Sequence, residues 1–433
     1  MTEEQKDKTK PLRDTLDILN HLQWYTPERM EVIQTHKLRQ LVAHHVNTSP
    51  FFQQRIKESG LTPQDIDSAH MERLPILSRQ DIISAGDSFF STNVPASHGN
   101  VGEVKSSGST GEPVKIKATA MVSTFFHCYN MQEVAWNKRD VKSRFAVVKA
   151  GKFETQLYDR WSHPLFKETG PMQVINIYTD IKEQARILAE FRPDVISVYP
   201  SNLDALMDYW DEHGGAPEFK HIKTVGETVH DKLRERVKKK FNLKIEDVYS
   251  SQELGSIAMP CEQGLYHTTD QNLIVEILDE AGVPVAEGET GRVVVTDMHN
   301  YASPMIRYDT GDWAVRGGKC SCGRGLKTIQ KVMGRYRNLL KRPDGTRHWP
   351  QVGMYEFDQL SFKIRRYQLI QHTLTDIEYR VQVDELLNDE QKSELIRIAQ
   401  AALGDEFAIT VNDTTDIWPQ APNGKHEEFI CRA

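Results

Sequence analysis

The sequence predicts an α/β protein with a large N-terminal domain and a small α+β C-terminal domain. Between residues 144 and 250, short apolar or β-branched runs alternate with amphipathic segments, a pattern typical of a parallel sheet with crossover helices. A strand-rich segment follows, and then a segment that mixes strands with one helix. With 39% hydrophobic and 27% charged residues over 433 positions, the chain can bury a sizeable core.

The charge balance excludes two classes of partner. Lys and Arg number 54 against 61 Asp and Glu, so the formal charge is −7. Binders of nucleic acid or of anionic membranes need a basic surplus instead. The polar start MTEEQKDKTK is unlike a signal peptide, and no run approaches the ~18 apolar residues of a membrane span. We expect a cytoplasmic protein without a disulfide framework, and a homodimer remains open.

The first hundred residues are expected to be mainly helical. Apolar residues from Leu38 to Val46 recur at helical spacing, and the pairs Thr62-Pro63 and Leu74-Pro75 interrupt the helices. The expected α/β core covers about 101–250, with helices beginning near Asp180, Ser201 and Val229. Its expected strands span residues 145–148, 173–178, 194–199, 221–225 and 244–249.

The C-terminal part divides into two further segments. A β-rich part over about 251–334 contains the expected strands 273–278 and 292–296 around a Gly/Pro turn region. The boundary falls near Gly334, giving an N-terminal domain over 1–334 and a small mobile domain over 335–433. The small domain should hold strands 378–383 and 408–411, and a helix with one apolar face made by Leu395, Ile398, Ala399 and Ala402.

The strongest local motif is SSGSTGEP at residues 106–113. Four hydroxyl side chains and two glycines in eight residues can form a tight loop that offers N–H and hydroxyl donors to a polyphosphate. It is no Walker loop, because Gly111 is followed by Glu112-Pro113 instead of Lys and Ser or Thr. A flexible Ser/Gly linker is the equal alternative for this loop taken alone.

Three other motifs could contribute residues to the same site as the 106–113 loop. YSSQE places Glu253 after a predicted strand, where open α/β sheets bind ligands, and RYDTGD places Asp309 and Asp312 in a turn. NGK puts Lys425 on a glycine turn in the small domain. Taken singly they favour a cap, an Asx turn and a surface lysine. Their combination with the 106–113 loop is much harder to obtain by chance.

The chain resembles the adenylate-forming superfamily, in its phenylacetate-CoA ligase-like branch, over nearly its whole length. The resemblance implies the adenylate-forming fold and an enzyme that uses ATP and Mg²⁺ to make an acyl-adenylate from a small carboxylic acid. The acyl group would then pass to coenzyme A. It rests on the four motifs above and on HHVNTSPFF, LPILSRQDI, RPDVISVYPS, VGE (225–227), DVYSSQE, GLYHTTDQNLIVEIL, PMIRYDTGD and Gly334-Arg335.

The resemblance also implies roles for individual residues. Glu253 would bind Mg²⁺, Asp312 the ribose hydroxyls, and Lys425 the carboxylate and α-phosphate, while Lys341 would serve the second step. The attacking carboxylate and the phosphate of ATP are both anions, and Mg²⁺ and a lysine would offset the repulsion between them. The remaining ATP or AMP contacts would come from the phosphate loop, the adenine-framing segments and a residue near the ribose: Ser106, Ser107, Gly108, Ser109, Thr110, Gly111, Gly226, Glu227, Asp247, Tyr249, Ser250 and Arg335.

Some positions depart from the family pattern. Arg337 stands where relatives have an acidic hinge residue, and VVKAGKFETQLYDRW (147–161) replaces the glycine-rich border of the aryl pocket, so the acid need not be phenylacetate. Two alternatives to a CoA ligase stay open. One is transfer of the acyl group to an amine, a hydroxyl or a carrier-protein thiol, and the other is a non-catalytic nucleotide-binding scaffold.

Two further residue sets are candidates for binding. Three cysteines and one histidine form a complete tetrahedral set for a structural Zn²⁺, with packing cysteines as the alternative: Cys261, His267, Cys320 and Cys322. Four aromatic or imidazole side chains are candidates for the acyl pocket, although large aromatics usually belong to the core: His127, Tyr129, Trp136 and Tyr199.

Overall fold

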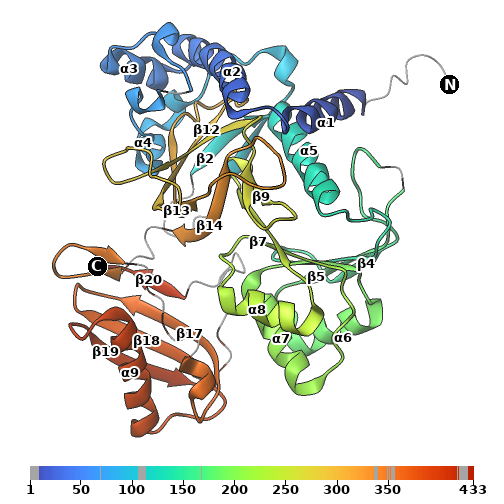
Figure 1. Ribbon diagram of the computed structural model, residues 1–433, viewed down its shortest axis with the longest axis vertical. Coiled ribbons are helices and arrows are strands. Elements are labelled where there is room, and N and C mark those ends of the chain that lie inside the picture. Colours follow the sequence, from blue (N-terminus) through green and yellow to red (C-terminus); the bar gives the residue numbers. More distant parts are fainter. Residues whose placement is uncertain are drawn as a thin grey trace.

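A twelve-stranded mixed sheet forms the centre of the large N-terminal unit (Figure 1). The computed structural model describes residues 9–68, 70–105, 114–166, 168–335, 340–348, 350, 352, 356–416, 418 and 428–433. Five neighbouring strands of the sheet run parallel, which confirms the expected α/β core. In sheet order they are β5 (Met172–Asn176), β3 (Phe145–Lys149), β6 (Val195–Val198), β7 (His221–Val225) and β8 (Ile245–Ser251).

Helices cover both faces of the parallel strands (Figure 1). Ile222 packs in one core with α6 (Ile181–Phe191), α7 (Pro200–His213) and α8 (Asp231–Phe241). The next residue, Lys223, points to the opposite face and pairs with Glu133 of α5 (Ala120–Trp136) at 3.0 Å. This alternation is the two-residue period of a strand. The third crossover helix was expected from Val229, but Val229 is buried just before its start.

The sheet changes from parallel to antiparallel at β8. Its neighbour β9 (Gly255–Pro260) is antiparallel, and the strands that follow in the sheet continue so, in the segment that was expected to be rich in strands. At the other edge, β4 (Gln156–Tyr158) pairs antiparallel with β5. The further strands are β10 (Tyr266–Thr268), β14 (Thr328–Arg335), β13 (Tyr308–Arg316), β12 (Thr290–Asp297) and β11 (Leu273–Leu278).

The N-terminal hundred residues are mainly helical, as expected. Ser49 and Thr26 cap α3 and α2, and proline stands in the first turn of both helices. The helices are α1 (Lys10–Leu22), α2 (Pro27–Thr48), α3 (Pro50–Ser59) and α4 (Arg79–Ala85), with short 3₁₀ turns at Pro63–Asp65, Met71–Arg73, Gly86–Phe89 and Ala96–His98. A hairpin of β1 (Val101–Lys105) and β2 (Lys115–Thr119) follows them, and residues 106–113 lie outside the described residues.

The C-terminal unit is a small α+β structure beside α7 and α8 (Figure 1). Helix α9 (Asp389–Leu403) packs through Leu395 and Ile398 against a four-stranded sheet. In sheet order the strands are β19 (Ala408–Thr414), β18 (Asp376–Val383), β17 (Ile364–Gln371) and β20 (Phe429–Cys431), preceded by the pair β15 (Leu340–Lys341) and β16 (Arg347–His348) and a 3₁₀ turn at Glu356–Gln359.

The division of the chain near residue 334 stays a proposal. Strand β14 ends at Arg335, residues 336–339 lie outside the described residues, and β15 begins at Leu340. A separate apolar core on the C-terminal side supports this division. None of the helices in the described ranges combines the length and the apolar character that crossing a bilayer requires.

Candidate active site and a cysteine–histidine cluster

A cleft of about 2490 Å³ opens between the two units, at the carboxyl ends of β7 and β8. Open α/β sheets bind ligands at this edge. The cleft brings together most of the described residues for which the sequence predicts nucleotide contacts. Those that line it are Gly226, Glu227, Asp247, Tyr249, Ser250, Glu253 and Asp312.

Tyr249 and Asp312 meet across the sheet. The Tyr249 hydroxyl donates to Oδ2 of Asp312 over 2.8 Å. The sequence places Asp309 and Asp312 in a turn, but both lie within β13, where Asp312 pairs with Arg335 of β14 and the backbone N–H of Gly311 donates to Asp309 over 2.8 Å. The pairing of this stretch with β12 is irregular and Gly311 has φ +76°, so the residues form a bulged part of the strand instead of a loop. A hydrogen bond to a carboxylate is stronger than a neutral one, so Tyr249 fixes the orientation of the Asp312 carboxylate.

The Asp247 carboxylate forms hydrogen bonds with other side chains of the protein. It is buried and accepts hydrogen bonds from Thr224 (3.1 Å), Tyr266 (2.7 Å) and Arg234 (3.3 Å). Burial raises the pKa of Asp247, and these partners oppose the rise. The carboxylate therefore ties β7, β10 and α8 together beneath the edge of the cleft.

The Gly226-Glu227 loop is held against the start of α7. Gly226 has φ +83°, a left-handed conformation that glycine adopts without strain. The Glu227 carboxylate accepts from the Ser201 N–H (2.9 Å) and hydroxyl (3.0 Å). A carboxylate at a helix N-terminus is favoured by the helix dipole, so this contact fixes the loop after β7.

Glu253 lies in the turn between β8 and β9. The N–H of Leu254 donates to the Ser251 hydroxyl over 3.1 Å, which closes this turn and holds Glu253 half-buried at the cleft. A carboxylate oxygen is the kind of ligand that Mg²⁺ prefers. The side chain therefore fits the role that the family resemblance implies.

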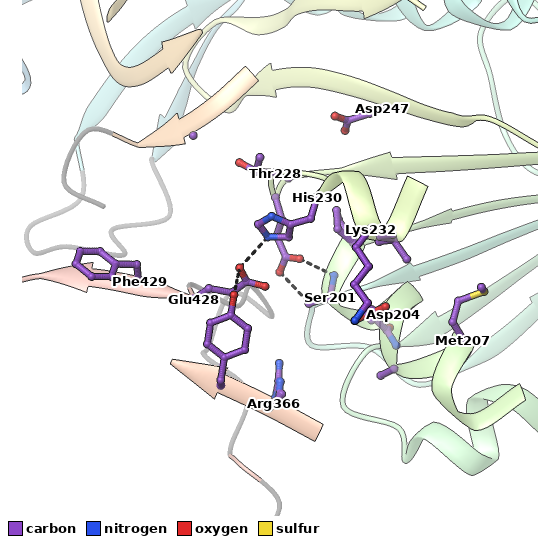
Figure 2. A pocket seen from close by; sticks show the side chains of 18 of the residues that line it. Ser201, Asp204, Met207, Thr228, His230, Lys232, Asp247, Arg366, Glu428 and Phe429 are labelled. Carbon is purple, nitrogen blue, oxygen red and sulfur yellow. Dashed lines mark hydrogen bonds and ion pairs between the residues drawn. The ribbon is translucent and has the colours of Figure 1, made fainter. Parts of the chain in front are cut away.

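The small unit adds a second set of polar groups (Figure 2). Oε2 of Glu428 lies 2.9 Å from Nε2 of His230 and accepts from the Tyr367 hydroxyl over 3.0 Å, while Arg366 lines the same cleft. The Glu428 carboxylate raises the pKa of His230. Sequence reasoning missed this group. The sequence feature that could have identified it is the position of Glu428, three residues after Lys425.

The remaining predicted residues are not all at this cleft. Ser106, Ser107, Gly108, Ser109, Thr110, Gly111 and Lys425 lie outside the described residues, as does the side chain of Arg335. Lys341 is absent from the described lining of the cleft. Its backbone N–H donates to Gln371 over 3.0 Å, and its ammonium donates to the carbonyl of Ala433 within the small unit.

The four acyl-pocket candidates are dispersed. Tyr129 and Trp136 are buried in an apolar core, and the Trp136 indole donates to Gln23 over 2.8 Å, which favours the core alternative for these two. Tyr199 is half-buried just before α7. His127 lines a separate cavity of about 260 Å³, away from the residues of the cleft.

The four predicted zinc ligands converge. Cys261 follows β9, His267 lies in β10, and Cys320 and Cys322 occupy the loop between β13 and β14. Their ligand atoms all lie within 4.8 Å of one another, with 3.6 Å from Cys261 Sγ to Cys320 Sγ and 3.2 Å from Cys322 Sγ to His267 Nε2. Zn–S bonds of about 2.3 Å set tetrahedral sulfur separations of roughly 3.8 Å. The cluster therefore fits a four-coordinate zinc ion.

The loop that carries Cys320 and Cys322 is joined to the N-terminal helices. Arg324 lies 4.3 Å from the centre of the Trp136 ring and 5.3 Å from that of Trp24, and it donates to Gln23 over 3.1 Å. Cation–π contacts of this kind add about 0.5–2 kcal/mol each. A ligand that orders the cluster would therefore also hold the segment between α1 and α2 and the end of α5 in place.

The fold is that of adenylate-forming CoA ligases. The chain matches 2-hydroxyisobutyryl-CoA ligase in its postadenylation state, with 2-HIB-AMP bound, at a TM-score of 0.69, covering 93% of this chain and 90% of that one with 16% identity. The same ligase in its thioesterification state, with 2-HIB-AMP and CoA, gives a TM-score of 0.57, again at 16% identity, with coverage of 93% and 90%.

Curated relatives agree with the fold. The chain is 24% identical over 382 residues to phenylacetate-coenzyme A ligase of Thermus thermophilus, covering 83% of this chain and 82% of the relative. It is 22% identical over 347 residues to the Escherichia coli enzyme of that name, with coverage of 74% and 75%. No protein-family model matches the chain. The resemblance to the phenylacetate-CoA ligase-like branch of the adenylate-forming superfamily is confirmed.

Proposed function

We propose that this protein is an ATP-dependent acid–thiol ligase, which activates a small carboxylic acid as its acyl-adenylate and then transfers the acyl group to coenzyme A. The observation that carries the proposal is the cleft in which Tyr249 orients Asp312 and which Glu253 also lines. The similarity of most of the chain to phenylacetate-coenzyme A ligases supports the same reaction.

In the first step, a carboxylate oxygen of the acid attacks the α-phosphorus of ATP. The bond from that phosphorus to the α,β-bridging oxygen breaks, and pyrophosphate leaves. Residues 106–111 would hold the β- and γ-phosphates, Asp312 the ribose, and Lys425 the approaching anions. Glu253 would hold Mg²⁺, which neutralises phosphate charge when bound.

In the second step, the CoA thiolate attacks the acyl carbon. The bond from that carbon to the AMP oxygen breaks, so a thioester forms and AMP leaves. The solved 2-hydroxyisobutyryl-CoA ligase, whose fold this chain shares, was captured with an acyl-adenylate and CoA together, which supports CoA as acceptor. Lys341 lies on the small unit and is proposed to serve this step.

Acid-dependent exchange of labelled pyrophosphate into ATP tests the proposal, because it reports the first step without an acceptor. A panel of aryl and short aliphatic acids should include at least one that supports exchange, and CoA should then yield the thioester. Exchange combined with acyl transfer only to an amine, a hydroxyl or a carrier-protein thiol, giving an amide, an ester or a carrier-bound thioester, would favour the alternative acceptor. ATP binding without exchange on any acid would favour the scaffold.

We further propose that Cys261, His267, Cys320 and Cys322 hold one structural Zn²⁺. The closeness of all four ligand atoms supports this, as does the burial of Cys261, Cys320 and His267. Zinc in a closed tetrahedral set contributes stability and no chemistry.

A further inference from the structure

One contact in the cleft joins the two units through Glu428, which follows the predicted catalytic lysine closely in the sequence. Figure 2 shows His230 of the large unit facing Glu428 of the small unit, with 2.9 Å between Nε2 and Oε2. The two side chains are 45% and 33% exposed, so the pair is partly shielded from water. Tyr367 donates to the same oxygen over 3.0 Å and fixes the carboxylate from its own unit.

The backbones on both sides of this contact are well anchored. His230 immediately precedes α8, in the loop that also contains Gly226 and Glu227. On the other side, the backbone N–H of Leu369 in β17 donates to the Glu428 carbonyl over 2.7 Å, directly before β20. The contact therefore joins the nucleotide side of the cleft to the core sheet of the small unit.

Glu428 follows Lys425 by three residues in the chain. Because each residue spans at most about 3.6 Å, chain geometry keeps the Cα of Lys425 within about 11 Å of the Cα of Glu428. Fixing Glu428 against His230 thus limits where the Lys425 side chain can act. A second contact between the units, from Glu212 of α7 to Lys363 and Arg365 at 2.6 Å, joins the small unit far from Lys425 in sequence.

We propose that His230 and Glu428 are positioning residues, whose contact aligns the Lys425 segment with the cleft for adenylation and is dispensable for transfer to CoA. The inference rests on the proposed function. Neither residue needs to touch ATP or the acid. Each acts through the pose of the small unit, so the two half-reactions should respond differently to its loss.

The contact should also depend on pH. The charged groups that act on His230 are Glu428 from the small unit, Asp204 from α7 and Lys331 from β14, and Tyr367 reaches the site through its bond to Glu428. The Glu428 carboxylate raises the pKa of His230, so the charged pair persists to a higher pH than an ordinary histidine would allow. Above that raised pKa the positive charge is lost and the contact weakens.

The test compares His230→Gln, Glu428→Gln and the double variant with the wild type in two assays. One is pyrophosphate exchange with an acid that the wild type accepts, and the other is CoA thioester formation from preformed acyl-adenylate. Each single variant should lower exchange about three- to tenfold and leave transfer within about twofold. The double variant should be no slower than the worse single variant, because both remove the same contact.

His230→Lys keeps a positive charge at high pH, so its exchange should fall less than that of the wild type as the pH rises from 7 to 9. The surface variant His36→Gln on α2 is a matched control and should match the wild type. Glu212→Gln loosens the other contact between the units, and it should slow exchange less than His230→Gln does.

Several outcomes would overturn the proposal. They are equal slowing of exchange and transfer, wild-type exchange in His230→Gln, or a Glu212→Gln defect as large as that of His230→Gln. Wild-type protein that exchanges no pyrophosphate with any acid would instead refute the proposed function, so the two failures are distinguishable. Melting temperatures within a few degrees of wild type show that the variants are folded.

Discussion

Single residues at the cleft edge were predictable, but their partners were not. The motifs around Tyr249 and Asp312 mark both residues as candidates, yet nothing in the sequence indicates that they bond to each other across 63 positions. For Asp247 the sequence predicts the position but not what the carboxylate binds. The sequence places it at the edge of the cleft, whereas the structure shows its carboxylate bonded to Thr224, Tyr266 and Arg234. Side-chain partners depend on strand order and register, which motifs do not encode.

The first prediction concerns the hydrogen bond from Tyr249 to Asp312. Tyr249→Phe removes the donor and leaves the Asp312 carboxylate less ordered, so the KM for ATP should rise about three- to tenfold. The fold should be retained, because the ring stays. Pyrophosphate exchange at varied ATP concentration measures the change, with Tyr158→Phe on the exposed β4 as the control. An unchanged KM for ATP would show that Asp312 does not depend on this bond.

The second prediction concerns Lys425. Its ammonium would stabilise charge that develops as the carboxylate reaches the α-phosphorus, so Lys425→Ala should lose pyrophosphate exchange by roughly 100-fold or more. ATP binding, measured by calorimetry, should weaken much less. The exposed Lys57→Ala on α3 serves as the matched control. Exchange near the wild-type rate in Lys425→Ala would refute its assignment to adenylation.

Whole elements were predictable where the apolar pattern was periodic. The expected strands 221–225 and 273–278 coincide with β7 and β11, because each is a short apolar or β-branched run between turns. Helix α5 was not foreseen. It carries apolar residues on most of its surface and packs against both α1 and β9, so its sequence shows little one-sided periodicity. The hairpin β1–β2 was missed because its strands are short and largely polar.

The third prediction concerns the cysteine–histidine cluster, which connects several strands and loops. If the cluster holds zinc, Cys320→Ser should lower the metal content from about one ion per chain and the melting temperature by several degrees, because the ion would link the loop before β14 to β9 and β10. Elemental analysis of protein purified without chelator measures the metal. Cys431→Ser, at a cysteine outside the cluster, should change neither quantity. Wild-type protein that carries no zinc would refute the site.

At the scale of the whole molecule, the arrangement of the two units follows from contacts that the sequence does not reveal. The change from a strand-rich segment to one that mixes strands with a helix predicts a boundary near residue 334, and the separate apolar cores support it. The pairs His230 with Glu428 and Glu212 with Arg365 join segments more than 150 residues apart, and no local pattern marks either of them. The family resemblance could locate the cleft, but not the contacts that hold the small unit over it.

Lys341 tests whether the small unit serves two steps. In the present arrangement its ammonium donates to the carbonyl of Ala433, and Lys341 is absent from the described lining of the cleft. If a second pose of the small unit brings Lys341 to the acyl-adenylate, Lys341→Ala should leave pyrophosphate exchange unchanged and slow thioester formation from preformed adenylate about tenfold.

Lys392→Ala on α9 of the same unit removes a lysine that pairs with Asp413 at 2.7 Å, and it should affect neither step. Equal loss of both steps in Lys341→Ala would mean that this lysine only supports the fold of the small unit, and a matching fall in its melting temperature would identify that cause. Loss of transfer alone would mean that the small unit presents a different face to the cleft in each half-reaction. The contact between His230 and Glu428 would then have to break between the two steps, because it joins the two units in the present arrangement.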